Sequence, residues 1–268
     1  MLGSSGIFVK ISESSPSLIA FYRSLFALPF LYVWMLFEER HNSSNVNWDR
    51  RNMFFLILGG LCFALDMSIW NWSLSFTSVA NATLMANTAP VFVVIFGILL
   101  LGYKIELSFL FTLLLALIGV FLVVLPGEKT MVFGDSLGLI AAIFYAGYIL
   151  SIKDLTNFLK PARTLFLVTF VTTFCLLPIS LIENGDLNIN LSEFFILLAY
   201  AIFSQTIAQG LITSGISRVS AHLSSLVLLM QPVAAALYGW FLLEEILTPL
   251  QVFGGFIVLT AIYMASQK

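Results

Sequence analysis

Charged residues are scarce in this chain of 268 residues: Asp, Glu, Lys and Arg together make up 10% of it, whereas 60% is hydrophobic. A soluble domain usually has about 25% charged residues and about 45–50% apolar ones. The chain therefore has too little polar surface to coat a water-soluble globule. This shortage excludes a soluble enzyme, a nucleic-acid-binding protein and a disordered scaffold. The composition instead predicts a protein that crosses a membrane several times.

The sequence also lacks the short motifs of common catalytic and energy-coupling sites. It contains no GxxxxGK[ST] stretch, so ATP is not the expected energy source, and no HExxH pattern. The two cysteines, Cys62 and Cys175, lie inside apolar runs far from any cluster of metal ligands. We interpret them as small apolar side chains. We therefore expect no catalytic residue, no cofactor and no metal ion.

Long apolar runs dominate what is present. Nine of them are long enough to cross a bilayer as helices, for which about 20 residues are needed. The opening residues 1–11 are apolar but reach only about half a span, and we interpret them as the end of a tenth helix whose front is missing. The nine runs are 18–37, 53–76, 79–101, 107–125, 134–152, 164–182, 192–213, 221–243 and 250–266.

The positions of the basic residues favour one topology. If the N-terminus is inside and the chain crosses ten times, only Lys10 and Lys129 fall in outside loops, and Arg23 lies within a span. Such an asymmetry is what the positive-inside rule describes. We therefore predict a multi-pass protein of the plasma (inner) membrane with both termini in the cytoplasm. The inside residues are Arg40, Arg50, Arg51, Lys104, Lys153, Lys160, Arg163, Arg218 and Lys268.

The two halves of the chain share a sequence pattern. A shift of 142 residues lays residues 77–121 over 219–263 with nine identities in 45 positions, and it pairs Pro90 with Pro232. Each half holds five crossings, an odd number, so the two halves would have opposite orientations in the membrane. Inverted repeats of this kind are typical of secondary transporters, whose substrate sites lie between the repeats.

These observations predict an all-α polytopic membrane protein, a ten-helix bundle of two inverted five-helix repeats with the first helix incomplete. We place the first repeat at residues 1–125 and the second at 134–266.

Three segments resemble the EamA-type transporters of the drug/metabolite transporter superfamily. They are SFTSVANATLMANTAPVFVVIFGILLLG (75–102), SRVSAHLSSLVLLMQPVAAALYGWFLLEE (217–245) and the FYRSLFALP stretch of the second span. The resemblance covers nearly the whole chain as two five-helix repeats. It implies a ten-helix transporter with cytoplasmic termini that moves small metabolites, often amino acids or related compounds, outward.

Asp66, near the middle of the third span, is the sharpest candidate for a functional residue. An acid at the bilayer centre costs about 2.5–3.5 kcal/mol on insertion scales and usually faces a cavity or a partner. Asp66 could bind a substrate amine or couple transport to protons, or it could form a structural ion pair. Arg23 is the expected partner in such a pair, which would orient Asp66 or cap the cavity. Binding of a substrate carboxylate and snorkelling to the interface are the alternatives for Arg23.

Helical periodicity extends this candidate site along the third span. Asp66, Trp70, Ser73 and Thr77 follow one another at i, i+4, i+7 and i+11, which places them on one face. A stripe of acid, indole and hydroxyl groups is not expected to face lipid. We predict that Trp70 and Ser73 line the substrate pathway beside Asp66.

Amide side chains supply further candidates. Gln205 and Gln209 share a face of the eighth span, near the repeat positions of Asp66 and Trp70, and Asn81 and Asn87 lie in the fourth span. They could line the cavity or form hydrogen bonds between helices.

Aromatic residues and prolines complete the candidate set. Tyr145, Tyr148 and Trp240 could stack on a substrate or a cation, although each could equally be core or lipid-facing. Pro90 and Pro232 each remove a backbone donor within a span, so we expect helix kinks there that line the site.

The resulting functional hypothesis is a secondary-active transporter, an exporter of small metabolites such as amino acids or amines, working by alternating access between the two repeats. One alternative is a polytopic membrane enzyme, which would need Asp66, Arg23 and His222 to converge. The other is a non-transporting or degenerate membrane protein. The expected partners are a small-molecule substrate and the lipid bilayer, without nucleic acid, and both a monomer and a homodimer are compatible with the sequence.

Overall fold

The computed structural model describes residues 5–40, 48–124, 132–243 and 248–267. Within these ranges the chain is helical and contains no strand. The helices are α1 (Ser5–Ile11), α2 (Pro16–Glu39), α3 (Arg50–Phe76), α4 (Val79–Ala86), α5 (Ala89–Leu101), α6 (Leu107–Val124), α7 (Val132–Leu155), α8 (Pro161–Asn184), α9 (Leu191–Tyr200), the π-helical segment η2 (Ala201–Ala208), α10 (Gln209–Arg218), α11 (Ala221–Val227), α12 (Met230–Leu243) and α13 (Pro249–Ser266).

The apolar runs form membrane-length helices, as the sequence predicts. In the described part of the chain, eight helical stretches are long and apolar enough to cross a membrane, and a shorter apolar stretch covers Ala221–Ala234. Some of these stretches consist of consecutive helices, such as α4 with α5 and α9 with η2 and α10. An all-α polytopic membrane protein is therefore confirmed.

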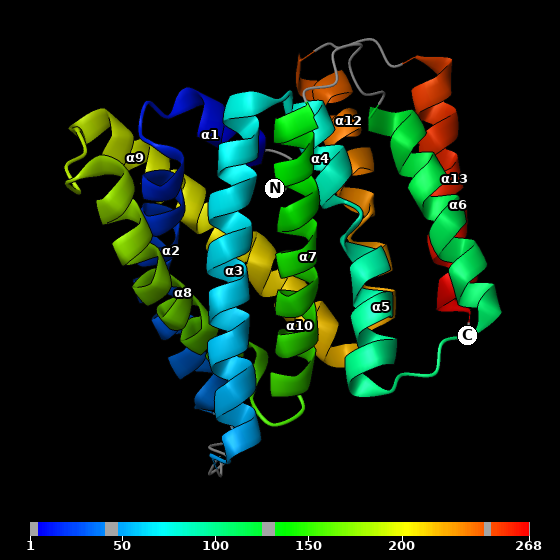
Figure 1. Ribbon diagram of the computed structural model, residues 1–268, viewed down its shortest axis with the longest axis horizontal. Coiled ribbons are helices and arrows are strands. Elements are labelled where there is room, and N and C mark those ends of the chain that lie inside the picture. Colours follow the sequence, from blue (N-terminus) through cyan, green and yellow to red (C-terminus); the bar gives the residue numbers. More distant parts are fainter. Residues whose placement is uncertain (1–4, 41–47, 125–131, 244–247, 268) are drawn as a thin grey trace.

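The helices alternate in direction and stand side by side as a bundle (Figure 1). Helices α3 and α7 pack together at the centre, α2, α8 and α9 flank them on one side, and α6 and α13 form the opposite end. At the lower edge in this view lie the start of α3 and the end of α7, which the Arg51–Asp154 ion pair joins, and the end of α2 and the start of α8, which the Arg163–Glu39 ion pair joins. The connections 12–15, 77–78 and 185–190 lie at the upper edge.

The internal repeat is visible in the element lengths. Adding 142 to the bounds of α6 (107 and 124) gives 249 and 266, which are the bounds of α13. The same shift carries the N-cap Ser78 of α4 onto the N-cap Ser220 of α11, and each hydroxyl accepts a hydrogen bond from the backbone three residues later. Helices α2 and α8 are both 24 residues long and begin with proline. The two-repeat architecture is thus confirmed.

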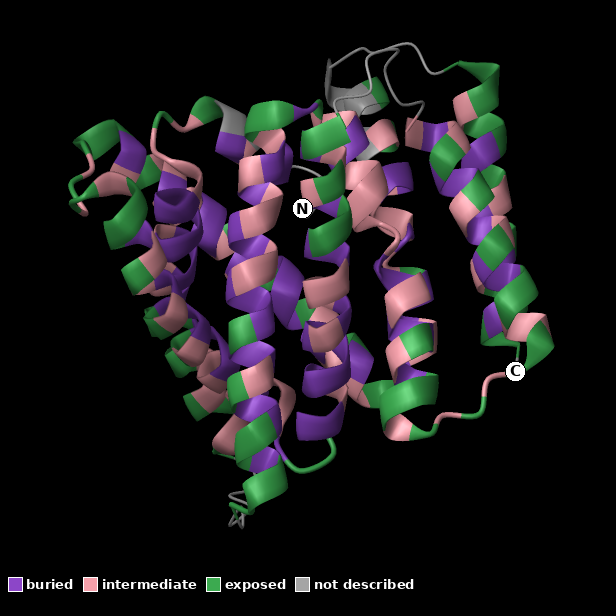
Figure 2. Ribbon diagram, in the orientation of Figure 1, coloured by how far each residue is buried: buried purple, intermediate pink, exposed green. Residues whose placement is uncertain are grey.

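The two largest hydrophobic clusters of the described residues pack most of the helices together. The larger joins α2, α3, α7 and α8, and the second joins α5, α6 and α11–α13. Exposed apolar residues cover the outer faces, as expected for lipid-facing helices (Figure 2). Helices α6 and α13 approach most closely at Gly119 and Gly254, where a Cβ on either residue would lie 2.8 or 2.7 Å from the carbonyl oxygen of the other. Small residues permit such close approach between membrane helices.

Candidate functional site

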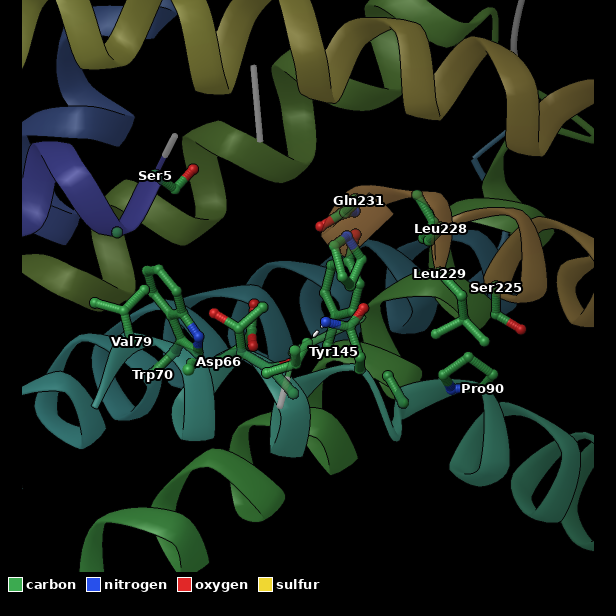
Figure 3. A pocket seen from close by; sticks show the side chains of 18 of the residues that line it. Ser5, Asp66, Trp70, Val79, Pro90, Tyr145, Ser225, Leu228, Leu229 and Gln231 are labelled. Carbon is green, nitrogen blue, oxygen red and sulfur yellow. Dashed lines mark hydrogen bonds between the residues drawn. The ribbon is translucent and has the colours of Figure 1, made fainter. Parts of the chain in front are cut away.

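A cavity of about 500 Å³ is lined by residues of both repeats (Figure 3). Its wall draws on α1–α5 and α7, on α10–α12, and on the ends of α6 and α13. Ligand pockets are commonly about 300–1,000 Å³ in volume. Of the sequence-predicted site residues, eight line this cavity: Arg23, Asp66, Trp70, Asn87, Pro90, Tyr145, Gln209 and Pro232.

Asp66 lies beside Trp70 on the wall that α3 contributes (Figure 3). The two residues are one helical turn apart, so both side chains reach the same cavity, as periodicity predicts. Within the described part of the chain, the Asp66 carboxylate has neither an ion-pair partner nor a hydrogen-bond partner. The ion pairs found there are Arg51–Asp154 and Arg163–Glu39.

No direct salt bridge forms between Arg23 and Asp66, although the two charges interact electrostatically. Arg23 is buried, with 7% of its surface exposed, and its Nη1 donates a hydrogen bond to the Tyr200 hydroxyl at 3.0 Å. The guanidinium carbon also lies 4.9 Å from the centre of the Tyr200 ring. Tyr200 thus offers both an acceptor and an aromatic face, and Arg23 takes them in place of the carboxylate. Arg23 Nε has no hydrogen-bond partner among the described residues.

Two tyrosines of α7 have different roles in the wall. Tyr145 lines the cavity, whereas Tyr148 is fully buried and stacks on Tyr145 with ring centres 5.8 Å apart. Tyr148 also stacks on Phe63, at 4.3 Å, and its hydroxyl accepts a hydrogen bond of 2.8 Å from Gln209 Nε2. Tyr148 does not itself line the cavity, but it contacts Phe63, Tyr145 and Gln209, which do.

Ser73, Asn81 and Gln205 do not line the cavity. Ser73 donates to the carbonyl of Trp70 at 2.7 Å, so its hydroxyl is used within its own helix. Asn81 is buried in the first turn of α4. Gln205 lies in η2 and donates to Thr169 Oγ1 of α8 at 3.1 Å. Because a π-helical turn holds more residues than an α-helical turn, the 3.6-residue period misplaces Gln205 relative to Gln209.

The prolines break their helices completely. Helix α4 ends at Ala86 and α5 begins at Ala89, just before Pro90. In the second repeat two residues separate the end of α11 at Val227 from the start of α12 at Met230, and Pro232 lies in the first turn of α12. Both prolines line the cavity. The loss of the backbone donor thus produces a break that faces the cavity rather than lipid.

Two other candidates lie away from the cavity. His222 is hydrogen-bonded to Ser220 at 3.0 Å and meets the ring of Phe109 edge-on, and Trp240 is exposed. The described residues contain no group of three or more His, Cys, Asp or Glu side chains that could hold a metal ion.

Sequence reasoning missed part of the cavity wall. Thr83 and Ser225 both line it and are related by the shift of 142 residues, so the repeat could have found them. Tyr200 carries no comparable signal, since it is one aromatic residue in an aromatic-rich chain. The other residues missed on the wall include Ser5, Phe63, Val79, Leu228, Gln231 and Gln251.

Comparisons with known proteins agree with this architecture. The chain is 25% identical over 256 residues to the pseudopaline exporter of Pseudomonas aeruginosa, covering 94% of this chain and 87% of the relative. It is 27% identical to an uncharacterized transporter of Archaeoglobus fulgidus, covering 99% of this chain and 82% of the relative. One crystal structure, 14% identical in sequence, superposes with a TM-score of 0.74 over 99% of this chain and 95% of the other. The EamA-like transporter family matches residues 1–125 and 132–267. The chain therefore belongs to the EamA-like transporter family and is a multi-pass membrane transporter.

Proposed function

We propose that the protein is a secondary-active exporter of small metabolites that carry an ammonium group, with amino acids as the leading class. One observation carries this proposal: Asp66 and Arg23 line the same cavity, and no salt bridge joins them. A charge left unpaired within a membrane protein is costly, so it is expected to serve a ligand, an ion or a water path.

A zwitterionic ligand would satisfy both groups together. Its ammonium would bind Asp66, and the indole of Trp70 one turn away would add a cation–π contact. Its carboxylate would accept hydrogen bonds from the Arg23 guanidinium, whose Nε has no hydrogen-bond partner among the described residues. An amine without a carboxylate would use only the Asp66 half of the site.

Asp66 also offers a route to energy coupling. A proton and a substrate ammonium would compete for the same carboxylate, so each could displace the other on opposite sides of the membrane. Exchange of this kind, combined with rocking of the two inverted repeats, constitutes alternating access. The outward direction is supported by the family resemblance and by the relative that is named an exporter.

The basic lower edge supports an orientation for this cycle. Arg51, Lys153, Lys160 and Arg163 belong to helix ends on that edge, and by the positive-inside rule we assign it to the cytoplasm of a plasma (inner) membrane. Helix α13 ends toward that side, so the C-terminus would lie in the cytoplasm (Figure 1), whereas a cytoplasmic N-terminus remains a prediction from the sequence.

The first experiment is a thermal-shift screen of purified protein against amino acids, amines, sugars and nucleotides, followed by exchange assays with the hits in proteoliposomes. A ligand that binds the folded state raises the melting temperature by mass action. We expect hits among amino acids or amines, and loss of these hits in Asp66→Asn. Hits confined to sugars or nucleotides would contradict the proposed substrate class. Binding without exchange would favour the alternative of a non-transporting membrane protein.

A further inference from the structure

We propose that Tyr200 is a positioning residue that holds Arg23 away from Asp66 and so keeps both charges of the cavity available to the substrate. The inference rests on the proposed function in one respect, namely that a ligand uses these two charges. No pattern in the sequence singles out Tyr200, and the residue does not line the cavity.

Tyr200 is firmly fixed at the end of α9. Its side chain is fully buried, and its ring stacks on Phe8 of α1 with centres 5.1 Å apart and planes only 12° from parallel. Val9, Ile19 and Leu197 complete the apolar cluster around it. The residue that immediately follows begins the π-helical segment η2. The ring is therefore a rigid platform built from three separate parts of the chain.

Arg23 rests on this platform through two contacts. Its Nη1 donates to the Tyr200 hydroxyl at 3.0 Å, and its guanidinium carbon lies 4.9 Å from the ring centre. The hydrogen bond uses one of the five N–H groups of the guanidinium and leaves the Nε group without a partner. The contact therefore holds Arg23 without consuming its capacity to bind a carboxylate.

Such a hold is needed because opposite charges that line one cavity attract each other strongly. In a medium of low dielectric constant the attraction is far greater than in water, and a long arginine side chain can change rotamer to reach a carboxylate. A closed Arg23–Asp66 pair would have to be broken each time a substrate bound. Tyr200 competes with Asp66 for the guanidinium and thereby keeps the site open.

The Tyr200→Phe change tests the hydroxyl alone, since it retains the ring and its stacking. In the ligand-free protein, we expect the effect of Tyr200→Phe on the melting temperature to differ between the wild-type and the Asp66→Asn backgrounds, because Arg23 can move to Asp66 only when the carboxylate is present. Tyr22→Phe is the matched control, since it removes a hydroxyl from the residue next to Arg23 that is bonded instead to the Leu187 carbonyl. Its effect should be the same in both backgrounds. If Tyr200→Phe changes the melting temperature equally in the wild-type and the Asp66→Asn backgrounds, the inference is overturned.

Binding gives the second measurement. The probes are phenylalanine, phenethylamine, which lacks the carboxylate, and 3-phenylpropionate, which lacks the ammonium; the aromatic wall of Phe63, Trp70 and Tyr145 suits their shared ring. We expect Tyr200→Phe to weaken 3-phenylpropionate binding roughly 10- to 100-fold, as for a lost hydrogen bond to a charged group. In the Asp66→Asn background the same change should weaken it by no more than about twofold, because no carboxylate captures Arg23.

The outcomes separate the two proposals. Equal weakening in both backgrounds would mean that Tyr200 acts only through packing, and this would overturn the positioning role. If the wild type binds none of the three probes, the proposed substrate class fails, while the coupling of Tyr200 with Asp66 in the ligand-free protein still decides the positioning role.

Discussion

Replacing Asp66 by Asn separates a substrate-binding carboxylate from a structural one. The change keeps the shape of the side chain and removes its charge. In the described structure Asp66 has no ion-pair partner to leave behind, and its side chain faces the cavity. We therefore expect opposite effects on binding and on stability, and the two can be measured on the same sample.

The magnitudes follow from the contacts. A hydrogen bond to a charged group contributes about 1.5–3 kcal/mol, which at 1.4 kcal/mol per tenfold is about a 10- to 150-fold change in the Kd of an amine or amino acid. Removing one partner of a buried ion pair would instead cost about 3–5 kcal/mol of stability. Because Asp66 is unpaired, we expect the melting temperature of Asp66→Asn to be unchanged or higher.

The assay is calorimetric titration of phenylalanine and phenethylamine into protein in detergent, with a thermal melt of the same preparation. Asp154→Asn is the matched control, since Asp154 is buried and pairs with Arg51 away from the cavity. The control should lose stability and keep its affinity. A large loss of stability in Asp66→Asn, with affinity unchanged, would show that Asp66 is structural and would refute the reasoning.

Three further predictions concern the cavity wall and the helix packing. Trp70→Leu should weaken phenethylamine binding by about 0.5–2 kcal/mol, the range of a cation–π contact. Equal Kd values of variant and wild type in calorimetric titration would exclude that contact. Tyr148→Phe removes the acceptor of the buried Gln209 amide and should cost about 1–3 kcal/mol in a thermal or denaturant melt, whereas Tyr148→Phe with Gln209→Leu should cost less than the sum of the single changes. Gly119→Ala should destabilise the α6–α13 pair by about 1–3 kcal/mol through overpacking; its control, Gly215→Ala, meets open space and should be neutral or slightly stabilising, and equal melting temperatures of the two variants would contradict the close approach.

Much of the fold follows from the sequence alone, because the bilayer limits which backbone structures can cross it. Every spanning segment must satisfy its backbone internally, so long apolar runs become helices. The repeat then relates the two halves closely enough that α6 and α13 have the same bounds after the shift of 142 residues. The breaks before Pro90 and Pro232 follow from the chemistry of proline.

Only the tertiary structure decided which side chains meet. Periodicity places Asp66 and Trp70 on one face of α3, but it does not reveal which helix lies opposite. Arg23 could reach several partners, and the packing of α1 and α9 around Tyr200 decided among them. The π-helical turn at Gln205 likewise has no sequence signature, because it arises where neighbouring helices change the winding of the chain. The sequence therefore determined the helices and their order, whereas the packing between helices determined which charges of the cavity remained free.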